Sequence, residues 1–326
     1  MIRDYRNRGA LIYAMVHDLL PVRMPEVFPP GADQIFALWL KAVSTFDGAI
    51  CVSRAVANDL RARLDEHVPA INKRRLPYFI EWSHHGADIV NSAPTRGMPH
   101  DAEVTLQKLK SRVTFLMVGT IEPRKAYLQT IHAFDQLWAN GLDVNLVIVG
   151  HEGWKHVSHD MRRDIPQTIE LLRSHPERDN RLFWLEGISD EYLEKVYAAS
   201  TCLLAASYGE GFGLPLIEAA QHKLPIIARN IPLFREVVGE HAFYFEAASP
   251  GELTQSVSTW LDQYRRGEHP KSDNLPWLTW AESAKRLCEI VLSVASEQKK
   301  KAYGERDKNY GKADKNWQFG LYGFLG

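Results

Sequence analysis

The sequence has few of the features of secreted, membrane-spanning or nucleic-acid-binding proteins. Its 326 residues include only three cysteines, Cys51, Cys202 and Cys288, which lie far apart along the chain. No uninterrupted apolar run approaches the roughly 20 residues that span a bilayer, and the charged N-terminus lacks the apolar region of a signal peptide. The net charge of -1 gives no overall field that would attract nucleic acid or an anionic membrane. We expect a reduced, cytoplasmic protein in which all three cysteines are small buried side chains.

Motifs for metal binding and for nucleophilic serine are also missing. The thirteen histidines do not form an H-x-x-x-H zinc helix, and the chain has no G-x-S-x-G, no P-loop and no D-x-D. The neighbouring His84 and His85 are interpreted as a solvent-facing pair rather than as metal ligands. The sequence therefore predicts neither a bound metal nor a resident cofactor.

What the sequence does contain is a regular alternation of apolar strands and helices in its second half. Candidate strands rich in Val, Ile and Leu lie at 113–119, 145–150, 181–187, 201–207, 224–228 and 242–245. Candidate helices lie between them at about 126–139, 156–174, 190–199, 214–222 and 232–238. This alternation is typical of a parallel sheet covered on both faces. We expect an α/β, Rossmann-like domain at 106–296, which includes trailing helices at about 250–265 and 279–296.

The first half of the chain has the same character but fewer elements. Its candidate strands lie at 11–16, 48–53 and 76–82, with an amphipathic helix at about 34–45 and another that Ser53 caps. The polar stretch at 91–111 predicts a linker with a short helix. We expect an incomplete Rossmann-like domain at 1–105. At the other end, a basic and then aromatic tail at 297–326 is expected to be weakly ordered or to dock late.

The stretch S-Y-G-E-G-F-G-L-P-L-I-E, residues 207–218, joins a predicted strand to a predicted helix. Gly211 and Gly213 carry no Cβ, so their backbone can approach a ligand closely. Free N–H groups at the start of the next helix favour an anion at the same place. Glu210 and Glu218 bracket the loop, as hydroxyl-binding carboxylates would for a sugar nucleotide. A glycine-rich turn with two glutamates also arises by chance, so these residues alone leave the function open.

Two other strand ends carry candidate site residues. The string G-T-I-E-P-R-K, residues 119–125, places Arg124 and Lys125 where a strand gives way to a helix. Two such cations suit a diphosphate, although an isolated pair more often marks a solvated helix start. His17 follows the first strand, where it can donate to a sugar hydroxyl or serve as an ordinary loop residue. Asp18 is interpreted as a structural cap.

Three further segments are weaker candidates. The loop G-H-E-G-W at 150–154 either forms a wall of the pocket or is a plain turn. Ser189 and the acidic residues after it predict a helix start. Arg235 and Glu236 are interpreted as a structural ion pair.

The string E-G-F-G-L-P-L-I-E, residues 210–218, resembles the E-x7-E signature of retaining glycosyltransferases, particularly family 4 of the GT-B fold. G-T-I-E-P-R-K and V-H-D-L-L-P, at 16–21, resemble two more motifs of that family, although Ala126 stands where the family usually has Asn. The resemblance covers about residues 11–296. It implies the GT-B fold with two Rossmann-like domains, the N-terminal one abbreviated or truncated in this chain. It also implies transfer from a nucleotide diphosphate sugar without a bound metal.

The resemblance implies a role for each matched residue. Glu210 would bind the donor hexose and stabilise the transition state, and Glu218 would bind the ribose hydroxyls. Arg124 and Lys125, in the loop that begins at Gly119, would neutralise the leaving diphosphate. The remaining matched residues are expected to contact sugar, phosphate or base: His17 from the N-terminal domain, the backbone of Phe212, Gly213 and Leu214, and Ser189.

The chain looks most like bacterial mannosyltransferases of polysaccharide assembly. This likeness implies GDP-mannose as donor and a glycan or lipid-linked saccharide as acceptor, with peripheral contact at the inner face of the membrane. Two alternatives stay open: a nucleotide-sugar-binding partner subunit with little activity alone, and a GT-B-like sugar-nucleotide epimerase. Only about ten residues precede the His17 strand, which puts the acceptor side of the expected site in question.

Overall fold

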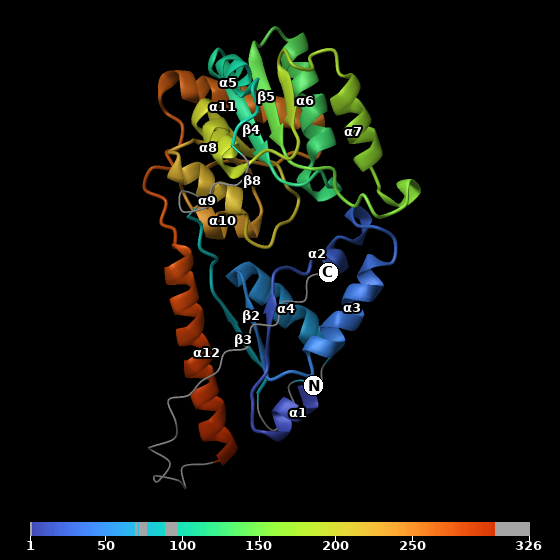
Figure 1. Ribbon diagram of the computed structural model, residues 1–326, viewed down its shortest axis with the longest axis vertical. Helices are drawn as coiled ribbons and strands as arrows, with labels where there is room; N and C mark the ends of the chain where they lie inside the picture. Colours follow the sequence, from blue (N-terminus) through green and yellow to red (C-terminus); the bar gives the residue numbers. More distant parts are fainter. Residues whose placement is uncertain (1, 69–70, 72–76, 89–96, 304–326) are drawn as a thin grey trace.

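Two parallel sheets, each with its own helices, divide the chain into two lobes (Figure 1). The computed structural model describes residues 2–68, 71, 77–88 and 97–303. The N-terminal lobe holds a three-stranded sheet of order β1-β2-β3, and the C-terminal lobe holds a six-stranded sheet of order β6-β5-β4-β7-β8-β9. Every strand pair is parallel. The predicted α/β class is therefore confirmed.

The C-terminal sheet has the doubly wound topology of a Rossmann domain. Counted within the lobe, its strands follow the order 3-2-1-4-5-6, and the winding reverses between β4 and β7. All six predicted strands are present: β4 (Val113–Val118), β5 (Val144–Val149), β6 (Leu182–Leu185), β7 (Cys202–Ala205), β8 (Ile226–Arg229) and β9 (Phe243–Phe245).

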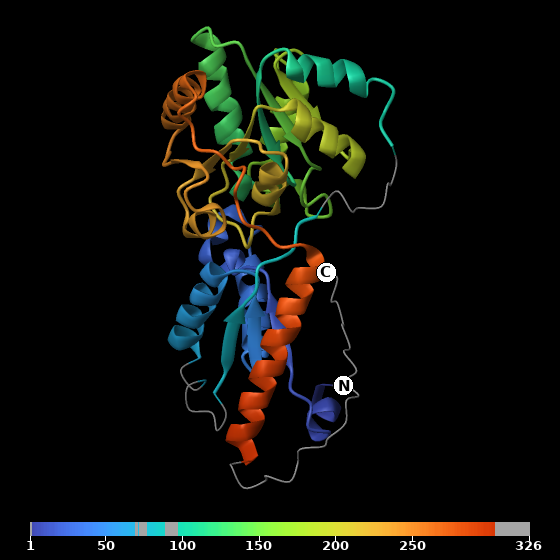
Figure 2. The ribbon, with the colours of Figure 1, turned by 90° about the vertical axis from the view of Figure 1, so that its left-hand side faces the viewer.

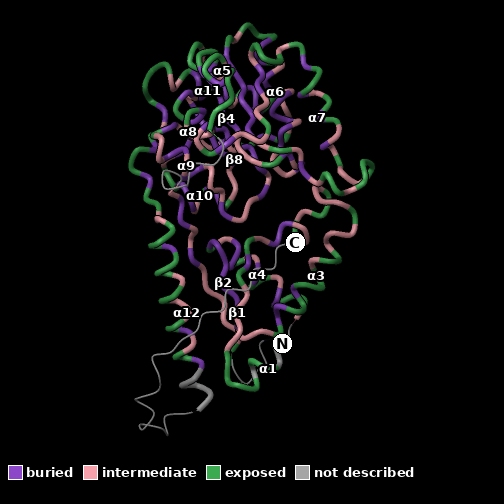
Figure 3. The backbone as a smooth tube through the Cα atoms, viewed as in Figure 1, coloured by how far each residue is buried: buried purple, intermediate pink, exposed green. Residues whose placement is uncertain are grey.

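Helices cover both faces of this sheet, because successive strand side chains point to opposite sides. Phe115 belongs to one apolar cluster and Leu116 to the other. The Phe115 face is covered by α6 (Tyr127–Ala139), α7 (Ile165–Ser174) and α11 (Pro250–Arg266). The Leu116 face is covered by α5 (Ala102–Lys110), α8 (Asp190–Ala199), α9 (Leu214–Gln221) and α10 (Pro232–Val238). The buried strands in Figure 3 thus form a rigid support for the loops at their ends.

The N-terminal lobe is smaller. Its strands are β1 (Tyr13–Val16), β2 (Gly48–Cys51) and β3 (Phe79–Trp82), and its helical elements are α1 (Ile2–Asn7), α2 (Leu20–Arg23), η1 (Pro25–Val27), α3 (Ala32–Val43) and α4 (Arg54–His67). The Ser53 hydroxyl accepts a hydrogen bond from the Val56 amide at 3.2 Å, so the predicted cap of α4 is confirmed. The short helices α1 and α2 were not predicted from the sequence, because neither is long enough to show a helical period.

The two lobes are joined by two neighbouring crossings of the chain. Gly86, in the first crossing that leads from β3 to the C-terminal lobe, forms a β-bridge with Leu278, in the second crossing that leads back to α12. A Cβ on Gly86 would lie 2.3 Å from the Trp280 nitrogen, so the two backbones are in direct contact. After the return crossing, α12 (Trp280–Tyr303) lies along the N-terminal lobe (Figure 2). Its Gln298 accepts a hydrogen bond from Tyr13 at 2.7 Å. This helix was expected as a trailing part of the C-terminal domain, and the structure differs in placing it beside the other lobe.

Three details correct the sequence interpretation. The helix expected at 156–174 begins only at Ile165, after a separate turn η5 (His159–Met161), because a proline occupies the first turn of α7. Helix α12 continues beyond the predicted end near 296, and the rest of the expected tail lies outside the described residues. Cys288 is exposed while Cys51 and Cys202 are buried. The prediction that Cys288 is buried was wrong because only one side of α12 is buried, the side that carries Ser283, Val294 and Gln298.

Candidate functional site

The candidate site lies at the carboxyl end of the C-terminal sheet, where the winding reverses. Doubly wound sheets bind ligands in the crevice that this reversal opens. The loop after β4 runs from Gly119 to η4 (Pro123–Lys125), and the loop after β7 runs from Ala206 to Gly213. The Tyr208 amide donates to the Arg124 carbonyl at 2.8 Å, which ties the two loops together. The predicted residues of both loops therefore meet at one place.

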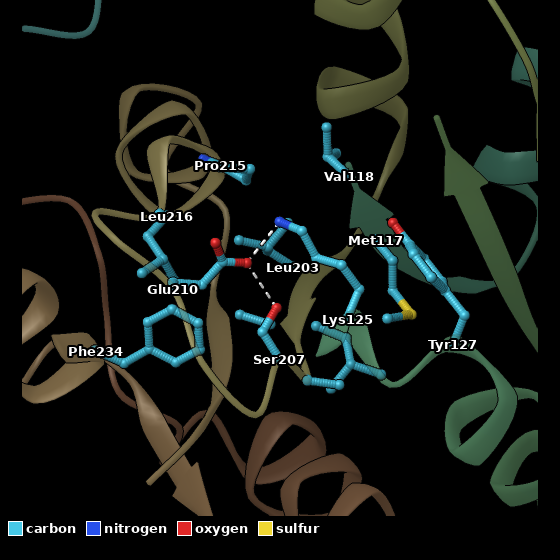
Figure 4. A pocket seen from close by; sticks show the side chains of 14 residues that line it. Met117, Val118, Lys125, Tyr127, Leu203, Ser207, Glu210, Pro215, Leu216 and Phe234 are labelled. Atoms are coloured by element: carbon cyan, nitrogen blue, oxygen red, sulfur yellow. Dashed lines mark hydrogen bonds and ion pairs between the residues drawn. The ribbon is translucent and has the colours of Figure 1, made fainter. Parts of the chain in front are cut away.

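Glu210 is the centre of a charge cluster in this crevice (Figure 4). Its carboxylate lies 2.5 Å from the Lys125 ammonium and 2.7 Å from the Arg124 guanidinium. The Ser207 hydroxyl donates to it at 2.8 Å. Burial alone would raise the pKa of Glu210, but the charges of Lys125 and Arg124 outweigh it, so its pKa is lowered. The carboxylate is therefore ionised and held by both cations.

The loop after β4 shapes the cationic side of the crevice. Arg124 also pairs with Glu122 at 2.8 Å, a contact that was not predicted from the sequence. Gly119 has a φ of 142°, and a Cβ there would lie 3.0 Å from the Lys125 nitrogen. Ala126 adopts the left-handed conformation, with a φ of 58°. Asn enters that region more readily than Ala, which gives a physical reason for the asparagine usual at this position in the resembling family.

Helix α9 supplies the side of the crevice opposite the two cations, with backbone N–H groups and the Glu218 carboxylate. It starts at Leu214 after Gly213, whose φ of 86° suits glycine, and its first turn has no side-chain cap. One helical turn further, the Glu218 carboxylate accepts a hydrogen bond from the Tyr197 hydroxyl at 2.6 Å. Burial raises the pKa of Glu218, and the Tyr197 hydrogen bond opposes that rise. Tyr197 was missed from the sequence because an aromatic residue on a helix usually indicates core.

The N-terminal lobe reaches the same loop through His17. The His17 carbonyl oxygen would lie 2.1 Å from a Cβ on Gly211, so this glycine is required for contact between the lobes. The exposed His17 ring stacks on His85, with ring centroids 5.4 Å apart. His85 meets the Phe212 ring edge-on at 5.4 Å. The predicted His17 and Phe212 are therefore brought close to the Glu210 loop, with His85 between them.

Two predictions about side chains near the site were wrong. Arg235 and Glu236 do not pair: Arg235 bonds to Asn230 at 2.7 Å, and Glu236 accepts from His84 at 2.8 Å. The sequence neighbours separate because Glu236 faces the N-terminal lobe. His84 and His85 are not solvent-facing, since both of their rings pack against the Phe212 ring.

The remaining candidates have structural partners. Ser189 is buried, caps α8 by accepting from the Tyr192 amide at 3.2 Å, and donates to the Gly97 carbonyl at 2.6 Å. Asp18 accepts from the Leu20 amide at 3.0 Å from just before Leu19, the N-cap residue of α2, so it has the structural partner that was expected without being the cap itself. The 150–154 loop lies against the loop after β4, since a Cβ on Gly150 would be 1.9 Å from the Gly119 carbonyl oxygen.

The part of the chain that the structure describes contains neither a metal-binding cluster nor a membrane-spanning helix. Within it, no group of three or more His, Cys, Asp and Glu side chains is arranged to hold a metal ion. No helix in those same ranges combines the length and the apolar character needed to cross a membrane.

Known structures share the fold. An Anabaena protein, HepE, solved in complex with UDP and glucose, has a TM-score of 0.64 and 18% identity, over 89% of this chain and 73% of that one. A sucrose-phosphate synthase from Thermosynechococcus elongatus has a TM-score of 0.65 and 18% identity, over 90% and 71% of the two chains. At such low identity these likenesses show the fold alone, and they confirm the expected GT-B architecture.

Sequence relatives and a family model are more specific. The serotype-specific mannosyltransferase WbdA of Escherichia coli is 42% identical over 300 residues, which are 92% of this chain and 36% of that protein. The O-antigen chain mannosyltransferase B of Escherichia coli is 30% identical over 129 residues, 38% of this chain and 30% of the relative. The chain thus spans about a third of the length of these relatives. The family model described as "Glycosyl transferases group 1" matches residues 102–273, more than half of the chain. The chain therefore belongs to the group 1 glycosyl transferase family.

Proposed function

We propose that this chain transfers a mannosyl group from a nucleotide diphosphate sugar to a saccharide acceptor, with retention of anomeric configuration. The observation that carries the proposal is the position of Glu210 between Lys125 and Arg124, at the reversal of the sheet. Two cations in a shielded crevice suit a diphosphate leaving group. A carboxylate beside them suits the sugar, whose anomeric carbon becomes positively charged as the diphosphate leaves.

As it binds, the donor would replace Glu210 as the partner of Arg124 and Lys125. Its phosphates take up the Arg124 and Lys125 charges and the uncapped first turn of α9, where backbone N–H groups and the helix dipole favour an anion. Glu210 is then free to accept a hydrogen bond from a hexose hydroxyl and to stabilise positive charge at the anomeric carbon. His17 lies beside the same loop from the N-terminal lobe and is proposed to approach the hexose.

Glu218 is assigned to the nucleoside. It lies one turn into α9, beyond the phosphate position, and its carboxylate is oriented by Tyr197. A carboxylate in this position can accept hydrogen bonds from both ribose hydroxyls. Gly119, Phe212, Gly213 and Leu214 contribute backbone close to sugar and phosphate. Ser189 is assigned the weakest role, near the base, because its hydroxyl already has two partners.

The choice of mannose rests on two relatives that are named as mannosyltransferases, one aligned with 92% of this chain and the other with 38%. Mannose is commonly activated as its GDP derivative, so GDP-mannose is the proposed donor. Because one relative is named for the O-antigen chain, the proposed acceptor is a growing glycan or lipid-linked saccharide. The proposed setting is the cytoplasmic side of the inner membrane, with peripheral contact.

The test is transfer of radiolabelled sugar from GDP-mannose to mannose oligosaccharides, with UDP-glucose as the competing donor. We expect turnover with GDP-mannose only, and an α-linked product by NMR from the α-linked donor. Arg124→Ala should lower kcat by roughly 10²–10³-fold. Arg266→Ala, which removes an exposed arginine paired with Glu268 on the far end of α11, serves as the matched control. Binding of GDP-mannose without transfer to any acceptor would contradict the proposal, and so would isomerised donor.

A further inference from the structure

Glu236 is a buried carboxylate of the C-terminal lobe whose hydrogen-bond partners lie in the N-terminal lobe and the first crossing. Glu236 lies on α10, and its side chain is only 6% exposed. Its two oxygens accept hydrogen bonds from the backbone amides of Arg54 and Ala55, each at 2.7 Å. One of them also lies 2.8 Å from the His84 ring nitrogen. Arg54 and Ala55 open helix α4 of the N-terminal lobe, and His84 belongs to the first crossing.

These contacts satisfy groups that a helix cannot satisfy by itself. The first N–H groups of a helix have no intrahelical partner and carry its positive dipole end. In α4, Ser53 accepts from Val56, while Glu236 accepts from the two residues before it. Burial alone would raise the pKa of Glu236, but His84 and the two amides outweigh it and lower the pKa. The cap of α4 is thus shared between the two lobes.

The elements that Glu236 holds also touch the loop after β7, which carries Glu210. Ser53, directly before α4, donates to the Gly211 carbonyl at 3.0 Å. Gly211 in turn lies under the His17 carbonyl. The His84 ring packs on Phe212, with centroids 5.2 Å apart. Movement of α4 or of His84 away from α10 would therefore pull His17 away from the loop that carries Glu210.

We propose that Glu236 is a positioning residue that fixes the N-terminal lobe, and with it His17, over the donor site. It needs no contact with the donor, because it acts through α4 and His84. A second contact between the lobes, from Arg163 to the Phe28 carbonyl at 2.6 Å, is independent of Glu236. Loss of Glu236 is therefore expected to let the lobes rotate about the remaining contacts rather than separate.

The first test needs no activity and uses the full chain without ligand. Glu236→Gln and Glu236→Ala are compared with Glu252→Gln, which weakens a capping carboxylate within the C-terminal lobe alone. We expect hydrogen exchange at Arg54 and Ala55 to accelerate by about tenfold or more in both Glu236 variants. Small-angle scattering should show a larger radius of gyration, and Glu252→Gln should show neither change. Unchanged exchange and radius in Glu236→Ala would overturn the proposal.

The second test rests on the proposed function, because it requires measurable transfer. Donor affinity, measured calorimetrically, should change by less than about threefold, since Glu236 lies outside the donor contacts. The value of kcat should fall by about tenfold or more, because a small misplacement of a reacting group is costly. Donor affinity and kcat falling together would overturn the positioning role. If the wild-type chain transfers nothing, the proposed function fails, while exchange and scattering still decide the role of Glu236 in the interface.

Discussion

The Glu210 carboxylate and the Lys125 ammonium lie 2.5 Å apart, at the point where the C-terminal sheet reverses its winding. Arg124 completes the cluster from the same loop as Lys125. In this state the cations proposed to bind a diphosphate are already neutralised by a residue proposed to bind the sugar. Donor and Glu210 therefore compete for the same charges, and binding the donor must release the carboxylate.

Removing the charge of Glu210 should separate binding from catalysis. In Glu210→Gln, Lys125 and Arg124 keep no ionised partner in the loop after β7, so a free nucleoside diphosphate should bind about tenfold more tightly, a gain of about 1.4 kcal/mol. Transfer should slow by roughly 10²-fold or more, because the transition state loses its stabilising carboxylate. Titration calorimetry with GDP and the mannosyl-transfer assay measure the two effects. Weaker GDP binding in the variant would contradict the proposed competition.

Glu218 should show the opposite pattern. Its pKa is raised above the ordinary 4.5 by burial. Such a group stabilises the fold below pH 4.5, and that contribution is lost as pH rises through the raised value. At neutral pH, Glu218→Gln should therefore raise the melting temperature of the free chain while weakening GDP binding. The rise should shrink on acidification. A variant that melts lower than wild type at pH 7 would show that the Tyr197 hydrogen bond outweighs the cost of burial.

Gly211 should tolerate no side chain. In Gly211→Ala the new Cβ would lie 2.1 Å from the His17 carbonyl oxygen, so the lobes must shift apart. We expect a destabilisation of about 1–3 kcal/mol, with loss of transfer. Gly251→Ala is the matched control, because its Cβ would meet only the Gln136 side chain at 3.6 Å. In that helical position alanine should stabilise by up to about 1 kcal/mol. Equal melting temperatures for the two variants would argue against a tight contact at Gly211.

The three cysteines should differ in reactivity. Burial raises the pKa of the Cys51 thiol to about 12, and burial also raises the pKa of Cys202. Cys288 is exposed on α12. A thiol reagent added to the native chain at pH 8 should therefore modify one cysteine rapidly and the other two only after denaturation. Cys288→Ser should abolish the rapid phase. A rapid phase that survives this change would place a second thiol at the surface.

The sequence allowed us to predict which residues of the candidate site lie together, because strand ends meet at one edge of a parallel sheet. Arg124, Lys125 and Glu210 follow strands that are about 90 residues apart, yet the apolar pattern alone predicts that they come together. Glu236 could not be assigned in this way. Its partners Arg54 and Ala55 lie more than 180 residues away in the other lobe. No periodicity within one domain indicates how two domains face each other.

Cys288 and the two histidines of the first crossing were misjudged for the same reason. The burial of Cys288 depends on which side of α12 meets the N-terminal lobe, and that of His84 and His85 depends on Phe212 above them. Within one sheet, the alternation of apolar residues indicates which side chains are buried. At a lobe interface, burial depends on how the two lobes dock. Sequence patterns therefore predicted the loops of the site better than their surroundings.

The return of α12 to the N-terminal lobe has a consequence for synthesis of the chain. Tyr13 receives its hydrogen-bond partner from Gln298, and Gln298 also donates to the Asp47 carbonyl at 2.9 Å. Within this chain, α12 follows β3 only after the whole C-terminal lobe, so the N-terminal lobe cannot receive this helix until that lobe has been synthesised. The C-terminal lobe, whose sheet and covering helices lie between Ala102 and Arg266, needs no part of α12 for its core and can fold earlier. During translation the C-terminal lobe should thus be complete before the N-terminal lobe, although it comes later in the sequence.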